Sequence, residues 1–426
     1  MEIKQCPPFA AILMKHSPDY TQYEKYYKQF HQNAELSWRE SETAEKVISI
    51  LKSLSTDLEI ITGIGGHGLV AILRNGPGTT LLLRADMDAL PVQELTDLDY
   101  ACKKTMLDDQ SQEQPVMHAC GHDMHLTALL ATADTLLSSR REWTGTVIFL
   151  FQQAEEKVAG ARAMVEAGLF TSLGCPIPDV LFSQHVYNYK AGTVATRLGP
   201  IMAGTDGMII KVYGRGGHGS SPHLSVDPVV LASSIVMRLQ TIVSREVPPG
   251  ELAVVTVGSL HVGSAENIIS DEAFLKVNTR SVSAKWKVVI LDAIKRIVRA
   301  ECEASGSPSP PVFIPTVSTV TLYNDEAVTK RLSRSFAQHF GADFDPITDL
   351  KPASEDFNQL ALAIDRPYCL WFIGAHDEDD WERREGDGTL HSVPMLHSPH
   401  FAPAPEKTLR TGVEAMVVAA LTYLSE

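Results

Sequence analysis

The stretch "TLLLRADMDAL" (residues 80–90) is a nearly continuous apolar run with two aspartates near its end. Similar runs lie before and after it along the chain: "GLVAIL" (68–73), "TVIFLFQQ" (146–153) and "DVLFSQHV" (179–186). Runs of this length and composition are typical of strands that are buried on both faces of a sheet. The segments between the later runs have apolar residues at helical spacing. This alternation of strands and helices predicts an α/β region with a mainly parallel sheet.

Further helices and one more strand complete the α/β region. The spacing of apolar residues predicts helices over 20–56, 125–137 and 160–169. Late in the chain, "YCLWFIG" (368–374) predicts another buried strand, and the last 20 residues predict a helix. The α/β pattern therefore resumes after an interruption.

The interruption has a different order of elements. It begins with a strand, "DGMIIKVYG" (206–214), and continues with a helix that has Asp227 as its expected N-cap and Pro228 as its first residue. Two strands and a long amphipathic helix (286–304) come next, and the Ser/Pro-rich "SGSPSPP" (305–311) suits a linker. This β-α-β-β-α order predicts a compact α+β unit inserted into the larger one. We therefore predict a large domain in two segments, 1–201 and 311–426, around an inserted unit, 202–310.

The composition excludes several classes of protein. A chain of 426 residues is long enough for two domains. Its net charge of −15 argues against nucleic acid or an anionic membrane as the partner. The six cysteines follow no repeating spacing, which fits a reducing compartment. No apolar run reaches the ~18 residues of a membrane span. Because "CPPFAAILM" (6–14) lacks a signal-peptide cleavage site, we expect a cytoplasmic protein.

A dense cluster of metal-binding residue types occurs in "MHACGHDMH" (117–125). Cys120 and His122 are two positions apart, so they cannot share one face of a helix, but they can in a loop. The loop precedes a helix that we expect to start near Asp123, at a strand end where α/β proteins build their sites. On this motif alone, a buried structural cysteine beside an incidental histidine remains an equal alternative to a metal site.

Three other segments place residues of the same kinds near expected strand ends or in loops. "FQQAEE" ends a strand with Glu155 and Glu156, and adjacent carboxylates repel each other unless a cation or a proton shares the site. His185 lies near the end of the next strand, and "LHSPHF" brings His397 and His400 before the last helix. The agreement of four segments favours a metal site over four unrelated surface groups.

Eight stretches, in this order, resemble the M20 metallopeptidase family and specifically its amidohydrolase branch, which contains hippurate, N-acyl-amino-acid and auxin-conjugate hydrolases. The stretches are "FHQNAELSWRESETA" (30–44), "RADMDALP" (84–91), "MHACGHDMH", "QQAEE", "GRGGHGSSPH" (214–223), "SLHVGSAENIISDEAFLKVNTRS" (259–281), "SEDF" (354–357) and "HSPHF". The resemblance implies a zinc-peptidase-like α/β catalytic domain that is interrupted by an inserted α+β lid domain of the dimerisation type.

The resemblance also implies a site with two divalent metal ions. Its ligands would be Cys120, His122, Glu156, His185 and His397, with the cysteine where related branches use a bridging aspartate. Glu155 would be the general base, and Asp88 would orient a ligand. In the lid, His218 would stabilise the oxyanion, within one subunit or across a homodimer, while Asn267 and Arg280 would hold the substrate carboxylate. A thiolate with imidazoles and a carboxylate suits zinc, with manganese, cobalt and nickel as alternatives. His125 and His400 match no ligand position, so we expect packing or substrate contact.

The predicted function is hydrolysis of the amide bond of N-acyl amino acids or related conjugates by a metal-activated water. A dipeptidase or carboxypeptidase of the same family is the alternative. A dinucleotide-binding enzyme is disfavoured: "GRGGHG" (214–219) does not open a helix, and "GIGGHG" (63–68) precedes a strand. Because every expected ligand and Glu155 are present, a catalytically silent relative is also disfavoured. Serines in "GHGSSPH" and a long charged segment (375–396) depart from the family pattern and leave the pocket's shape open.

Overall fold

The computed structural model describes residues 9–424, which form two compact units. The first unit extends to Gly199 and continues over Tyr323–Asp349 and from Asp356 onward, and the second consists of Pro200–Leu322 with Leu350–Glu355. Cys6 and the start of "CPPFAAILM" lie outside the described residues, and the rest of that stretch belongs to helix α1 (Phe9–Lys15). Within residues 9–424, no helix combines the length and apolar character that a membrane span requires.

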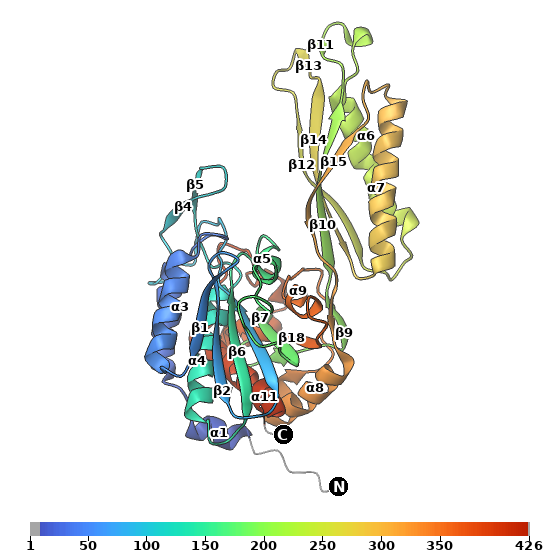
Figure 1. Ribbon diagram of the computed structural model, residues 1–426. Helices are drawn as coiled ribbons and strands as arrows, with labels where there is room; N and C mark the ends of the chain where they lie inside the picture. The colour runs from blue at the N-terminus through green and yellow to red at the C-terminus, as the bar shows by residue number, and fades with distance from the viewer. Residues whose placement is uncertain (1–8, 425–426) are drawn as a thin grey trace. The chain divides into compact units, whose positions relative to one another are not determined.

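The first unit is built on an eight-stranded sheet with the order β1-β2-β6-β3-β7-β18-β8-β17 (Figure 1). Its strands are β1 (Glu59–Ile64), β2 (Gly68–Asn75), β3 (Thr80–Asp86), β6 (Gly145–Gln152), β7 (Val180–Lys190), β8 (Val194–Ala195), β17 (Phe344–Asp345) and β18 (Tyr368–His376). The four central strands β6, β3, β7 and β18 run parallel, as expected from their apolar runs. Towards the edges, β1–β2, β2–β6 and β18–β8 are antiparallel. The short turn between β1 and β2 permits only an antiparallel pair.

Helices cover this sheet and enclose the main apolar core. The helices of this unit are α1, α2 (Tyr20–Gln32), α3 (Ser41–Leu54), α4 (His122–Ser138), α5 (Gly160–Glu166), α8 (Glu326–Phe340), α9 (Asn358–Leu362), α10 (Glu378–Gly386) and α11 (Pro405–Leu424), and those that contribute to the core are α1–α4, α8 and α11. Helices α4 and α11 pack against each other and against the sheet, and most of their residues are buried. A helix that is apolar on all sides belongs inside the molecule, so α4 provides a rigid base for residues at its N-terminus.

The single helix that the sequence predicted over 20–56 is wrong. The structure has two helices, α2 and α3, separated by residues 33–40. In this break Leu36 forms a β-bridge with Ala89, just after β3. The segment is held in tertiary contacts that helical periodicity alone does not reveal.

The second unit is a four-stranded antiparallel sheet with the order β12-β14-β10-β15 and with helices α6 and α7 on one face (Figure 1). Its elements are β10 (Gly204–Tyr213), α6 (Pro228–Thr241), β12 (Ala253–Val262), β14 (Glu272–Ser281), α7 (Ala284–Ala304) and β15 (Val312–Ser318). Asp227 caps α6 as predicted, because its side chain accepts a hydrogen bond from the N–H of Val229. The unit has its own apolar core between the sheet and the helices.

The second unit ends later than the predicted boundary at 310. Strand β15 pairs with β10, so it belongs to the same sheet, and the unit extends to Leu322. The Ser/Pro-rich stretch 305–311 therefore connects α7 to β15 within the unit instead of ending it.

Candidate metal centre

The carboxyl ends of the central parallel strands gather the predicted site residues of the first unit. Asp88 follows β3, Glu155 and Glu156 follow β6, and His185 lies in β7. Parallel strands that end at one sheet edge bring such segments together. The first turn of α4 and the loop before α11 add the remaining side chains at the same place.

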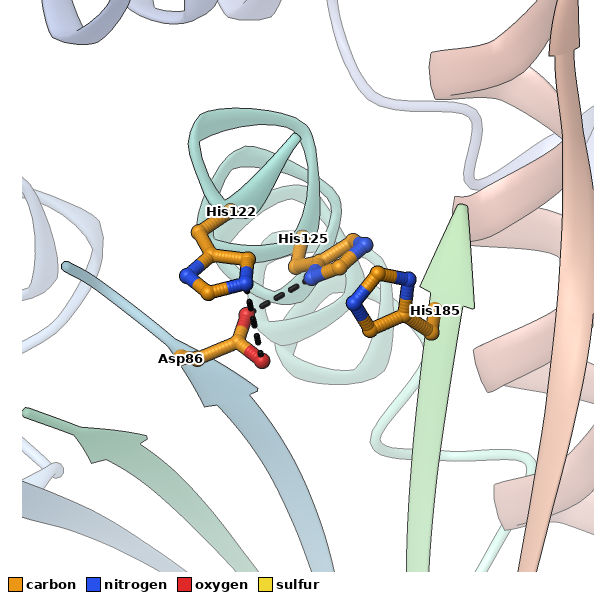
Figure 2. A group of neighbouring side chains, drawn as sticks. All are labelled: Asp86, His122, His125 and His185. Atoms are coloured by element: carbon orange, nitrogen blue, oxygen red, sulfur yellow. Dashed lines mark hydrogen bonds and ion pairs between the residues drawn. The ribbon is translucent and has the colours of Figure 1, made fainter. Parts of the chain in front are cut away.

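The five predicted ligands occur in three overlapping groups of ligand atoms, and within each group all the atoms lie within 4.8 Å of one another. The groups are Cys120, Glu156 and His397; His122, Glu155 and Glu156; and Asp86, His122, His125 and His185 (Figure 2). The Cys120 Sγ lies 3.5 Å from Nε2 of His185 and so links the first group to the third. All five predicted ligands and Glu155 are thus brought into one cluster.

Two unusual backbone positions deliver ligands to this cluster. Gly121 has a φ of 76°, and a Cβ there would lie only 2.5 Å from Cγ2 of Val186. A glycine therefore lets the chain turn sharply between Cys120 and α4. His397 also has a positive φ, 69°, and its N–H donates to the carbonyl of Ala119 at 2.8 Å. This hydrogen bond holds the late loop beside the cysteine.

Hydrogen bonds fix the tautomers of two imidazoles. His122 donates from Nδ1 to the carbonyl oxygen of Asp88 at 2.8 Å, and His185 donates from Nδ1 to that of Val186 at 2.6 Å. In the neutral form that binds a metal ion, both rings therefore present an unprotonated Nε2. The Nε2 of His122 is buried, and no residue in the described part of the chain hydrogen-bonds to it. Such an orphaned lone pair fits a metal ligand.

His125 lies in the same group but has no lone pair to offer. Its Nε2 accepts from the N–H of Val186 at 2.8 Å, so its Nδ1 carries the proton and donates to Asp86 at 2.6 Å. Both nitrogens are used inside the protein. His400 is exposed, and its Nδ1 donates to the carbonyl of Leu95 at 2.6 Å.

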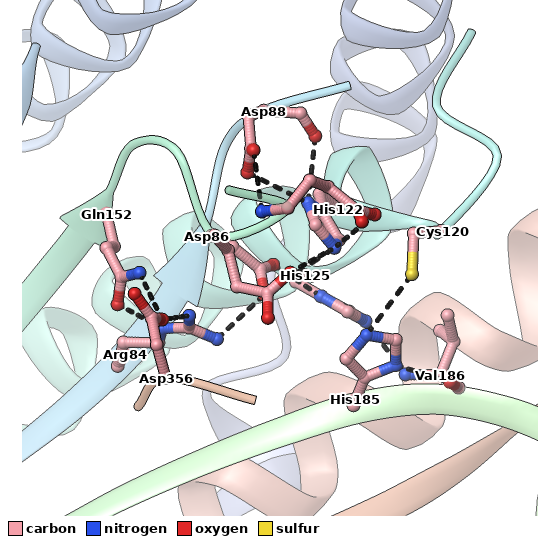
Figure 3. Close-up of polar contacts among 12 residues, drawn as sticks. Arg84, Asp86, Asp88, Cys120, His122, His125, Gln152, His185, Val186 and Asp356 are labelled. Carbon is pink, nitrogen blue, oxygen red and sulfur yellow. Dashed lines mark hydrogen bonds and ion pairs between the residues drawn. The ribbon is translucent and has the colours of Figure 1, made fainter. Parts of the chain in front are cut away.

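Asp86 is the residue of this cluster that the sequence reasoning missed. Its carboxylate accepts from His125 and, at 2.7 Å, from the fully buried guanidinium of Arg84. Arg84 also contacts Gln152 at 3.0 Å and Asp356 at 3.3 Å (Figure 3). The available signal was the two-residue spacing between Asp86 and Asp88, which places both on the same side of an extended chain.

The electrostatics of the cluster favour a bound cation. Burial raises the pKa of the Cys120 thiol well above its usual range, and the charges of Glu156 and Glu155 raise it further. Burial alone would lower the pKa of His122, but Asp86 and Asp88 raise it to about 10. Negative charge is therefore in excess here. A divalent cation would relieve it and stabilise the thiolate.

The remaining predicted residues belong to the second unit. His218 and Asn267 lie side by side, because the N–H of Gly219 donates to the carbonyl of Asn267 at 2.8 Å. The Nδ1 of His218 accepts from the N–H of Ser220 at 3.1 Å, which makes the exposed Nε2 the protonated nitrogen of the neutral ring. Arg280 is near the end of β14, where it donates to Asn278 and to the hydroxyl of Ser354.

Comparisons with known proteins identify the family of this chain. The family model of Peptidase family M20/M25/M40 matches residues 82–417. The hippurate hydrolase of Campylobacter jejuni is 38% identical over 309 residues, which cover 72% of this chain and 76% of that protein. The thermostable carboxypeptidase 2 of Saccharolobus solfataricus is 33% identical over 356 residues, which cover 82% of this chain and 85% of that protein.

A solved structure is similar along nearly its whole length. The YxeP protein of Bacillus subtilis, described as a dinuclear metal-binding peptidase of the M20 family, superposes with a TM-score of 0.73. Its sequence identity is 25%, and the match covers 94% of this chain and 97% of that one.

Proposed function

Because the chain belongs to Peptidase family M20/M25/M40, we propose that it is a metal-dependent amidohydrolase that cleaves the amide bond of N-acyl amino acids or related amino-acid conjugates. The observation that carries this proposal is the cluster of mostly buried ligand residues at the carboxyl ends of the central strands. The net negative charge of the chain argues against nucleic acid as a partner and is compatible with small-molecule substrates. We also propose that the enzyme is cytoplasmic.

We propose two divalent metal ions, zinc or manganese, with cobalt or nickel as alternatives. The ligands would be Cys120, His122, Glu156, His185 and His397. The orphaned Nε2 of His122 and the buried Oε1 of Glu156, which has no hydrogen-bond partner within residues 9–424, support this set. Bound metal ions of this kind polarise a carbonyl and lower the pKa of a coordinated water to near neutrality.

Glu155 is the proposed general base, which takes a proton from the attacking water and passes it to the leaving amine. Its carboxylate is largely buried, 3.9 Å from Nε2 of His122. Asp88 acts through its neighbours: its carbonyl fixes His122, and its Oδ2 accepts from the N–H of Glu156 at 3.0 Å. It therefore orients two proposed ligands at once.

In the inserted unit, we propose that His218 stabilises the oxyanion by donating from Nε2. Asn267 and Arg280 would hold the free carboxylate of the substrate, for which a guanidinium is the natural bidentate partner. The lid would also form a homodimer interface, which sedimentation of the purified protein would test.

The first test compares hippurate-type N-acyl amino acids with dipeptides. We expect a higher kcat/KM on the acyl conjugates, in line with the similarity to hippurate hydrolase. Higher turnover of dipeptides or of C-terminal residues of peptides would favour the alternative, which the relative named as a carboxypeptidase supports. No turnover of either class would contradict the proposed function.

Removing the metal ions should abolish activity and lower stability. After dialysis against a chelator we expect turnover to fall by more than ~10²-fold, because the carbonyl is no longer polarised. The melting temperature should fall as well, since a ligand that binds only the folded state stabilises it. Metal analysis with zinc or manganese add-back checks both effects. Full activity at zero metal content would exclude the proposed chemistry.

The Arg280 side chain gives a separate prediction. Arg280→Ala should lower kcat/KM by about 10- to 100-fold, the usual range for a charged hydrogen bond. Converting the substrate carboxylate to an amide should cost as much, and the two losses should not add, because both remove one interaction. Lys287→Ala, which removes a different positively charged side chain of the inserted unit, serves as the control. Equal activity of the wild type on free and amidated substrates would contradict the carboxylate role.

A further inference from the structure

Residues 33–40, the break between α2 and α3, belong to a motif for which the chemistry above has no role. Glu40 immediately precedes α3, and its side chain is fully buried. Although Glu40 occupies the N-cap position of α3, its side chain makes no capping hydrogen bond to that helix. Instead its Oε1 accepts from the N–H of Ala154 at 2.8 Å and from that of Trp38 at 3.0 Å. A carboxylate from the N-terminal region thus holds the residue directly before the proposed base.

The two residues that Glu40 holds have a strained backbone. Ala154 has a φ of 51° and Trp38 a φ of 69°, in the left-handed region that side chains with a Cβ disfavour. Such conformations persist only where the surrounding structure fixes them, and they cluster at functional sites. The backbone at Ala154 sets the direction in which the next residue, Glu155, leaves the loop.

A second contact from the same segment holds the other side of Glu155. The hydroxyl of Ser37 donates to Oδ2 of Asp88 at 2.7 Å. That oxygen also accepts the N–H of Glu156 at 3.0 Å. The residues on both sides of Glu155 are therefore tied to the break, one directly and one through Asp88.

We propose that Glu40 is a positioning residue, which with Ser37 braces the loop 154–156 and so holds Glu155 in place to accept a proton. This inference rests on the proposed role of Glu155. Glu40 acts because its side chain is long enough for one acceptor oxygen to meet both N–H groups, and its negative charge is not required. Burial and the nearby Asp88 raise the pKa of Glu40 to about 8, which agrees with a group that can do its work uncharged.

Matched variants separate reach from charge. Glu40→Gln keeps the length and one acceptor oxygen for both N–H groups but removes the charge. Glu40→Asp keeps the charge but is one methylene too short. The control is Glu35→Asp. Glu35 is a buried carboxylate of the same segment, but its Oε2 accepts from the N–H of Thr43 at 2.7 Å and from the Thr43 hydroxyl at 2.9 Å, and its Oε1 lies 3.6 Å from Nζ of Lys104.

The measurements are kcat, KM and metal content on hippurate or the best wild-type substrate, with a melting curve for each variant. Glu40→Asp should lose about 10- to 100-fold in kcat with KM and metal content nearly unchanged, because a small misplacement of a catalytic group has that cost. Glu40→Gln should stay within about 3-fold of wild type. Glu35→Asp should lower the melting temperature but leave kcat intact. A kcat equal to wild type in Glu40→Asp, or a loss of kcat in Glu40→Gln as large as that in Glu40→Asp, would contradict the proposed positioning role.

Amide hydrogen exchange over residues 152–158 gives a readout without substrate. We expect faster exchange at this loop in Glu40→Asp than in wild type, Glu40→Gln and Glu35→Asp. Unchanged exchange in Glu40→Asp would overturn the inference even if the enzyme acted on other substrates. If Glu40→Asp does not fold, Ser37→Ala tests the other contact, with Ser37→Thr as the conservative rescue, and unchanged kcat in Ser37→Ala would then overturn it. Activity of the wild type decides the proposed function separately.

Discussion

Replacing Glu155 by glutamine will lower kcat by at least ~10²-fold while the protein keeps its metal ions and its substrate affinity. Glutamine has the same volume and still hydrogen-bonds, but it cannot accept a proton from water. Because Glu155 is buried 3.9 Å from His122, the substitution leaves its position unchanged and removes only the proton transfer. Metal analysis and steady-state kinetics on the same preparation measure both parts of this result.

The neighbouring Glu156 is the natural comparison for this prediction. Its Oε1 lies 3.4 Å from Nε2 of His397 and belongs to the group with Cys120. Glu156→Gln should therefore weaken metal retention, since a neutral amide is a poorer ligand than a carboxylate. If Glu155→Gln loses metal and Glu156→Gln does not, the two roles are reversed. If neither change slows turnover, the active site lies elsewhere.

Cys120→Ser will lower metal content and activity together, by at least ~10²-fold in metal affinity. The Cys120 thiol is buried against carboxylates that raise its pKa, so only a bound cation would stabilise its thiolate. Serine cannot supply an equivalent anionic ligand. In wild type we expect thiol reagents to reach Cys120 only after chelation, which mass spectrometry of labelled peptides will measure.

Cys302 is a suitable control for this experiment. It is also buried, but it lies on α7 among the apolar residues of the second unit. Cys302→Ser should leave metal content unchanged, and any effect should be limited to stability. A Cys120→Ser variant with full metal content and full turnover would mean that the cysteine is structural.

The sequence predicted the central strands well because strands that are buried on both faces need uninterrupted apolar runs. It also predicted the α+β insertion and the family, and the fold class and family are confirmed. Local patterns failed where the structure depends on distant partners. The break at 33–40 is held by Ala89 and Ala154, which lie far along the chain from it. The end of the insertion depends on the pairing of β15 with β10.

The proposed ligands came from residue types and from the resemblance, which also suggested Asp88 as a supporting group, but the contacts of Arg84, Asp86 and Asp356 were not predicted. Arg84 and Asp356 are 272 positions apart in sequence, and nothing local to either indicates that they share a buried contact. The role of Asp86 becomes visible only through its contacts with Arg84 and His125 in the structure. For the same reason, Glu40 looks like an ordinary helix-start glutamate in the sequence. Its contact with Ala154 spans 114 positions.

The central place of β18 in the sheet matters for a chain that is still being synthesised. Strand β7 ends at Lys190, and its partner β18 starts at Tyr368, 178 positions later, after the whole inserted unit. At ribosomal rates this separation is a delay of roughly 10 to 35 s. During that time one long edge of β7 has no partner, and an unpaired apolar edge strand is a site for aggregation. We therefore expect the nascent chain, more than the finished enzyme, to depend on chaperones, and His397 to be the last of the proposed metal ligands to be synthesised.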